Sequence, residues 1–457
     1  MTADSAHAAA AAQPRCPAHA ARIPLHGAEF SQDPARFYAD LREHGPVAKV
    51  ELAPGVPASL VTDYSAALTV LRDPISFPRD PHHWQRSLPP TASMIAAMAF
   101  QPLCLIVDDS AHARLRGAMS DGLDRVDPTL LRASVERSAD LLIDEFIGAG
   151  RAELLADYAA VLPTLVLAQL YGASAGLGKR LMAGAVRAKN RSPHRTAVDL
   201  HESVSELVAY KRARRGTDVT SAMLDHPAEL TDEEVVDQLT ALGYGVEPLQ
   251  NWITNSLRLL LSDERFAGAV SGSVVVEDVL TEVLWADPPI ANHAPMFPVR
   301  DVEVQGVPLP AHQPVLISFA AANTDPELAV GQERAGNRAH LAFGAGPHSC
   351  PAQAPARVIA TVGIERLLDR LPDLELAVPA DRLTWRPGPY HRALAGLPVR
   401  FTAVGARSTS DRSTPRAPEP DTVHLPRPTA RPTPSESDGE ETGPAWWQSL
   451  TRWWRDR

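Results

Sequence analysis

The chain has 457 residues, of which 44% are hydrophobic, so it can bury one large core or two to three smaller ones. A formal net charge of −11 argues against nonspecific binding to nucleic acid. Three cysteines are too few for a disulfide framework, and no run of about twenty apolar residues offers a membrane span. We therefore expect a cytoplasmic protein with no nucleic-acid partner.

The first residues predict no targeting signal. Residues 1–20 are rich in alanine and have no basic segment, which favours a disordered leader. After the leader, the spacing of apolar residues changes between the period of a helix and that of a strand. This spacing predicts helices over residues 33–44 and 64–71 and strands over residues 47–52 and 58–62.

A third helical segment, DDSAHARLRGAM, spans residues 108–119. His112 and Arg116 are four residues apart and therefore lie on one face of this helix. Together they offer the charge-assisted donors that a buried carboxylate ligand requires. Arg114 points away from that face. The plainer alternative is that all three side chains are solvated surface charges.

The middle of the chain is mostly helical in its spacing. Residues 128–215 follow a helical period, and residues 164–171 within them are apolar nearly all round, as in a buried helix. A further long helix is predicted from Thr231 to about Ser262, and Glu234 completes a capping box in its first turn. Two glycines and a proline inside this helix require a local distortion. They are Gly243, Gly245 and Pro248.

One loop carries most of the chemistry. Residues 340–357, HLAFGAGPHSCPAQAPAR, place Cys350 at the start of a helix, where the helix N-terminus and the loop amides stabilise a thiolate. Gly344 permits a tight turn, Phe343 offers a flat apolar face, and His348 can donate to an anion. A single thiolate with no second soft ligand nearby suits haem iron better than zinc. The alternative is a glycine-rich turn around an inert, buried cysteine.

The spacing Phe-Gly-x-Gly-x-His-x-Cys over residues 343–350 resembles the haem-ligand loop of the cytochrome P450 superfamily. The resemblance extends over about residues 22–403. It implies an α+β fold that is mainly α with a smaller β region, in a haem domain spanning residues 21–404. It also implies that residues 177–215 form lid helices over the substrate.

The resemblance also implies a cofactor and its contacts. Haem b would be bound with Cys350 as the ligand of the metal. The cofactor-binding residues would be Phe343, Gly344, His348 and Cys350 of the loop, together with His112 and Arg116 as a clamp on the propionates. In the family, an acid and an alcohol in the distorted helix relay protons to bound dioxygen, and Glu247 matches the acid as a catalytic residue.

Two parts of the pattern are missing. Pro248 and Leu249 stand where the family has the alcohol, and Thr254 is about two turns away, so the proton relay is incomplete. Met296 stands where a strand often supplies a further arginine to the propionates. Arg300 follows four residues later.

A third departure concerns the Glu-x-x-Arg motif of the family. Here the motif is Glu282-Val-Leu-Trp285, so a tryptophan replaces the arginine, and the resemblance implies an atypical subgroup of soluble bacterial members that carries this change. A buried carboxylate without a cation is costly. Glu282 therefore pairs with another cation, for which Arg334 and Arg338 are candidates, or lies nearer water.

The composition changes after Gly405. Residues 405–443 are rich in proline, serine and threonine and predict a disordered linker. Residues 444–457 follow as a tail with five large apolar residues on one helical face, flanked by arginines. This tail is a candidate for docking to a membrane surface or a protein partner, which would make the protein peripheral to the membrane. The alternative is a disordered end without a role.

Two functions follow from these features. The first is a haem-thiolate monooxygenase that oxidises a small apolar molecule with dioxygen and electrons from a ferredoxin-type partner. The second is a catalytically weak haem-binding regulatory protein, docked through its tail to a membrane or signalling complex. The missing alcohol and arginine favour the second function, whereas the intact cysteine loop and Glu247 are compatible with the first. A scaffold without haem would leave His112 and Cys350 without a purpose.

Overall fold

The computed structural model describes residues 22–88, 98–174, 176–178, 180, 193–267, 273–329 and 336–404. The predicted leader, linker and tail lie outside these residues, as does part of the predicted lid. No helix of the described residues is long and apolar enough to cross a membrane.

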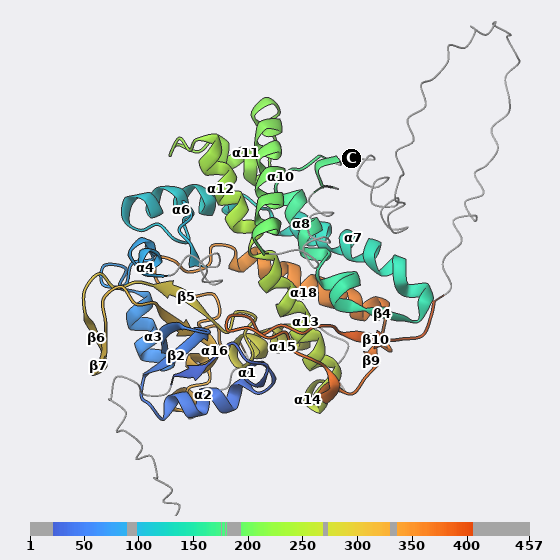
Figure 1. Ribbon diagram of the computed structural model, residues 1–457. Helices are drawn as coiled ribbons and strands as arrows, with labels where there is room; N and C mark the ends of the chain where they lie inside the picture. Colours follow the sequence, from blue (N-terminus) through green and yellow to red (C-terminus); the bar gives the residue numbers. More distant parts are fainter. Residues whose placement is uncertain are drawn as a thin grey trace, which may run out of the picture.

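Helices form most of the described chain, and Figure 1 shows them on both sides of a small sheet, with α1 and α2 below β2 and α6, α8, α10, α11 and α12 above it. Their bounds are α1 (Ala28–Gln32), α2 (Pro34–Arg42), α3 (Tyr64–Leu71), α4 (His82–Ser87), α6 (Asp109–Asp124), α7 (Pro128–Phe146), α8 (Leu162–Leu170), α10 (Pro193–Ala213), α11 (Val219–Leu224), α12 (Asp232–Gly243), α13 (Val246–Ser262), α14 (Glu264–Ala267), α15 (Ser273–Ala286), α16 (Phe319–Asn323), α17 (Pro326–Ala329) and α18 (Gln353–Arg370).

The largest sheet has five strands in the order β1-β2-β3-β8-β5. Their bounds are β1 (Ile23–Pro24), β2 (Val47–Ala53), β3 (Val56–Val61), β8 (Val315–Ser318) and β5 (Asn292–Met296). The strands predicted over residues 47–52 and 58–62 are confirmed, and they pair antiparallel with Val47 opposite Val61. Two smaller sheets join β4 (Arg151–Glu153), β10 (Pro398–Arg400) and β9 (Glu375–Leu376), and β6 (Val302–Val304) and β7 (Val307–Leu309). The predicted α+β class is therefore confirmed.

The helix predicted from Thr231 to Ser262 is divided in two. Its capping box is confirmed, because the Glu234 amide donates to the Thr231 hydroxyl and the Thr231 amide donates to the Glu234 carboxylate. The first part, α12, ends at Gly243, and α13 restarts at Val246. Pro248 has no N–H to donate and falls in the first turn of α13, where none is required.

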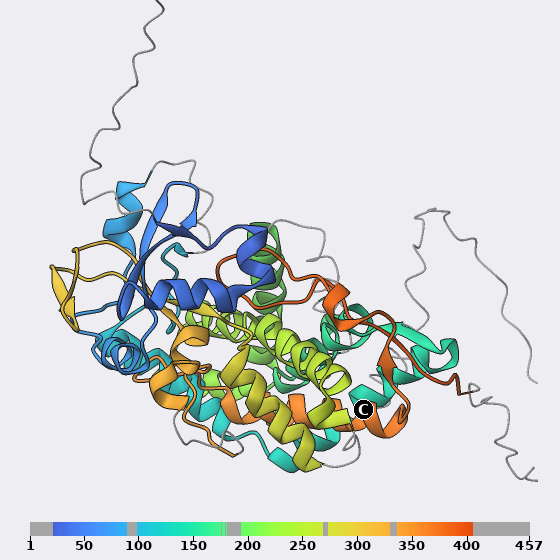
Figure 2. The same cartoon turned by 90° about the horizontal axis from the view of Figure 1, so that it is seen from below.

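The main core lies where α13, α15 and α18 meet α7 and α8. Trp252 of α13 is fully buried there, and its indole N–H donates to the carbonyl of Leu280. Figures 1 and 2 show β2 and β3 on one side of α13 and α7 on the other. The loop that carries Cys350 runs into α18, so this core holds the loop in place.

Candidate active site

The loop before α18 makes the tight turns that its glycines predict. Gly344 has φ of +72° and Gly346 has φ of +68°, a region that favours glycine. A Cβ atom on Gly346 would lie 2.3 Å from the carbonyl oxygen of Leu71, so only glycine allows the loop to approach α3. The turn is closed by the amide of Cys350, which donates to the carbonyl of Phe343 over 2.8 Å.

Cys350 is a free, partly buried cysteine at the base of α18. Burial raises the pKa of its thiol, while the amide of Ala352 and the charge of Arg116 oppose that rise. The Ala352 amide therefore favours the thiolate, as predicted for the loop, and Arg116 adds an effect that was not predicted, but together they do not outweigh burial. Coordination of a metal ion removes the proton outright, so this sulfur is suited to serve as a ligand.

The ring of Phe343 packs between two side chains of the core. Its centroid lies 5.7 Å from that of Trp252 and 5.9 Å from that of His340. The apolar face predicted for the loop is therefore present, and it is held by aromatic contacts on both sides.

Three predicted donors converge near the start of α6. The rings of His112 and His348 have their centroids 4.1 Å apart, and Arg116 is close enough to lower the pKa of both, after the larger effect of burial. Nε2 of His348 lies 3.0 Å from Asp108. Arg114 instead pairs with Glu234 of α12, as expected for a side chain on the other face of the helix.

This cluster fits the propionates of a haem. Nε2 of His112 and Nδ1 of His348 are buried, and neither has a hydrogen-bond partner within the described part of the chain. Burial lowers the pKa of His112 to about 4, and His348 and Arg116 add to this decrease, so the ring of His112 is neutral at physiological pH and can donate through one nitrogen. Buried donors of this kind require acceptors, which two carboxylates would supply.

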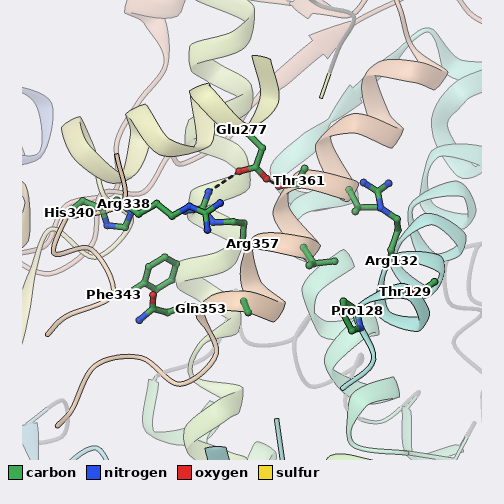
Figure 3. A pocket seen from close by; sticks show the side chains of 13 residues that line it. Pro128, Thr129, Arg132, Glu277, Arg338, His340, Phe343, Gln353, Arg357 and Thr361 are labelled. Atoms are coloured by element: carbon green, nitrogen blue, oxygen red, sulfur yellow. Dashed lines mark hydrogen bonds and ion pairs between the residues drawn. The ribbon is translucent and has the colours of Figure 1, made fainter. Parts of the chain in front are cut away.

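An open pocket of about 640 Å³ lies beside the cysteine loop. Figure 3 shows the Arg338 side chain extending toward those of Arg357 and Glu277, with His340 and Phe343 on the same side of the pocket as Arg338. The Arg357 guanidinium donates to Glu277 over 2.8 Å. This site was not predicted, because Glu277 and Arg357 are 80 residues apart in sequence and no local pattern joins them. We name it the arginine pocket.

A scan against protein-family models found no match. The cytochrome P450 monooxygenase PikC of Streptomyces venezuelae is 32% identical over 391 residues, covering 82% of this chain and 92% of the relative. The chain belongs to the cytochrome P450 superfamily. A 2-hydroxy-5-methyl-1-naphthoate 7-hydroxylase of Streptomyces carzinostaticus is 30% identical over 410 residues, covering 84% and 98%. The structure of CYP154C4 from Streptomyces sp. ATCC 11861 matches with a TM-score of 0.73 and 29% identity, over 84% and 98% of the two chains.

The family determines the class of the enzyme and its cofactor. This P450 is an oxidoreductase of the monooxygenase type, and its cofactor is haem b. The regulatory alternative is not favoured, because the relatives are named as monooxygenases and hydroxylases. The predicted subgroup with tryptophan in the Glu-x-x-Arg motif is not confirmed by these relatives.

Glu247, predicted as the acid of a proton relay, forms an ion pair in this P450. Glu247 accepts a hydrogen bond from Arg386 over 2.6 Å, with the two side chains 46% and 42% exposed. Burial raises the pKa of Glu247, but His391 and Arg386 together lower it below its ordinary value. A carboxylate held ionised in this way is a poor proton donor.

No hydroxyl compensates at the neighbouring positions. Pro248 and Leu249 carry none, and Thr254 is fully buried with its hydroxyl donating to the carbonyl of Gln250 over 2.7 Å. The relay predicted as incomplete therefore gains no alcohol from Thr254.

Trp285 occupies the place of the motif arginine in this P450. Its indole N–H donates to the carbonyl of Asn337 over 2.8 Å, and its ring meets that of His340 edge to face at 5.9 Å. Of the predicted cations for Glu282, Arg338 lines the arginine pocket and Arg334 lies outside the described residues. Glu282 is among the carboxylates that raise the pKa of Arg265, after Asp263.

Proposed function

We propose that this P450 oxidises a small apolar molecule with dioxygen and electrons from a ferredoxin-type partner, and that Cys350 is the ligand of its haem iron. The observation that carries the proposal is the convergence of His112, Arg116 and His348 near the loop of Cys350. When bound, a thiolate-ligated haem activates dioxygen for insertion of one oxygen atom into the substrate. The chain contributes the sulfur ligand, the donors for the propionates and an imperfect proton relay.

The positive charge of the arginine pocket favours docking of an acidic electron donor. Arg338 is exposed at its rim, and the pocket adjoins Phe343 of the cysteine loop. Reversing the charge by Arg338→Glu should raise the ferredoxin concentration needed for half-maximal reduction by about tenfold, because a rim charge acts on encounter with the partner. Reduction by dithionite should be unchanged.

Arg36 of α2 is an exposed arginine on another part of the molecule, so Arg36→Glu is the matched control. Stopped-flow reduction at two ionic strengths measures both variants. Equal ferredoxin dependence of Arg338→Glu and Arg36→Glu would show that the donor docks elsewhere.

The incomplete relay predicts poor coupling. In the unmodified enzyme, most of the reducing equivalents should end as hydrogen peroxide rather than as oxidised product. Pro248→Thr restores a hydroxyl next to Glu247 and should raise product per electron pair several-fold, since positioned acid–base groups contribute about 10²–10⁴-fold to rate. Product and peroxide are measured in the same reaction.

Pro248→Ala separates the hydroxyl from the helix geometry, because it removes the proline without adding an alcohol. An equal gain in coupling with alanine would assign the effect to the first turn of α13. Tight coupling of the unmodified enzyme with a good substrate would contradict the prediction directly.

We also propose that residues 444–457 dock this cytoplasmic enzyme to an anionic membrane surface or a partner. In a helix these apolar residues would share one face, and a helix of no more than about 12–15 residues is only marginally stable alone in water. These residues are Trp446, Trp447, Leu450, Trp453 and Trp454. Deleting residues 444–457 should abolish co-sedimentation with phosphatidylserine vesicles, or capture of a partner, and leave haem content unchanged. If the truncated and full-length chains behave alike in both assays, the tail has no docking role.

A further inference from the structure

The clamp at the start of α6 contains a carboxylate of its own. Asp108 accepts from the backbone amide of Arg79 over 2.7 Å, and its other oxygen lies 3.0 Å from Nε2 of His348. Two propionates would bring the number of carboxylates in this region to three. Arg116 is the one predicted donor with a charge that does not depend on pH. Since buried carboxylates require compensating cations, the site calls for a second fixed positive charge.

Arg79 meets this requirement by its position. It is partly buried, and its charge lowers the pKa of both His112 and His348. Burial lowers the pKa of Arg79 to about 10, and Asp108 opposes this decrease. Within the described residues its guanidinium donates no hydrogen bond, although the Arg79 amide does. The donors of a partly buried arginine are therefore available to a ligand.

The segment of Arg79 is joined to the end of β5. The amide of Phe297 donates to the carbonyl of Pro78 over 2.8 Å, and Phe77 and Met296 belong to one apolar cluster. Met296, which stands at the strand position where an arginine was sought, is apolar and only 2% exposed. Arg300 is exposed, and its charge lowers the pKa of Asp73. It therefore does not fill this position.

We infer that Arg79 anchors the haem by binding a propionate, in place of the arginine that β5 lacks. Its planar fork of donors matches a carboxylate in bidentate geometry. One oxygen of Asp108 binds the backbone amide of Arg79, and the other lies beside His348. Asp108 therefore fixes the positions of Arg79 and His348 relative to each other. Arg79 is thus a cofactor-binding residue from outside the helix and loop that carry the predicted contacts.

The test uses the full-length chain with haem removed and then titrated with hemin. Arg79→Met should weaken hemin affinity on the order of 10-fold to 100-fold, as loss of a supporting contact does at metal sites. The midpoint potential of the haem that remains bound should become more negative, because a nearby positive charge has been lost. Arg79→Lys should retain part of the affinity, since it keeps the charge without the fork.

Two further variants distinguish anchoring from a structural role. Met296→Arg in the Arg79→Met background should restore hemin affinity and the potential, because it returns a guanidinium to the same region. Arg114→Met, which removes an arginine of α6 paired with Glu234, should change neither. An Arg79→Met protein with unchanged affinity and potential would overturn the inference. So would a loss of affinity matched by earlier unfolding of the haem-free protein and rescued by neither lysine nor Met296→Arg.

Discussion

Replacing Cys350 with serine should abolish the long-wavelength absorption band of the reduced, carbon monoxide-bound protein. That band reports thiolate ligation of haem iron, and a serine hydroxyl cannot supply the same electron donation. Cys350 is the cysteine in the glycine loop, next to the amide of Ala352 and within range of Arg116. We expect complete loss of the band, measured by difference spectroscopy after dithionite reduction.

Cys104 provides the matched control. It is 1% exposed, its Sγ lies 3.9 Å from the sulfur of Met119, and burial raises its pKa to about 11. Such a thiol behaves as a small apolar side chain, so Cys104→Ser should keep the band in full. A Cys350→Ser protein that retained the band would show that another group binds the iron.

Short-range patterns predicted much of the site. The capping box of Thr231 and Glu234 depends on residues three apart, and the placement of His112 and Arg116 depends on one turn of helix. The turns of the cysteine loop follow from glycines, which adopt positive φ values without the steric cost that other residues incur. In each case the sequence itself holds the residues whose contact decides the geometry.

Contacts between distant segments were not predictable from the sequence. Glu247 was assigned as a relay acid, but its partner Arg386 comes from 139 residues further along the chain. The strand β4 has three residues, too few to show an alternating pattern within a helical region. Arg79 stands outside every motif, and the role proposed for it depends on the hydrogen bond from the Phe297 amide to the Pro78 carbonyl, which joins two distant segments. Such contacts arise from the tertiary fold, and no periodic pattern in the local sequence indicates them.

Replacing Trp285 with arginine should lower stability, despite restoring the family's motif. The indole is 4% exposed, donates to the carbonyl of Asn337 and meets His340 edge to face, so this space is shaped for a ring. A guanidinium there would be strained or mispaired, with a cost of about 1–3 kcal/mol. Trp285→Phe keeps a ring and loses the indole N–H, so it should cost about 1 kcal/mol from that hydrogen bond, plus the effect of a smaller ring. Urea unfolding of the haem-loaded variants, followed by absorbance and circular dichroism, measures both effects. A Trp285→Arg protein that unfolds later than the parent and binds haem more tightly would show that Glu282 accepts the new guanidinium, and that the tryptophan is replaceable at this position.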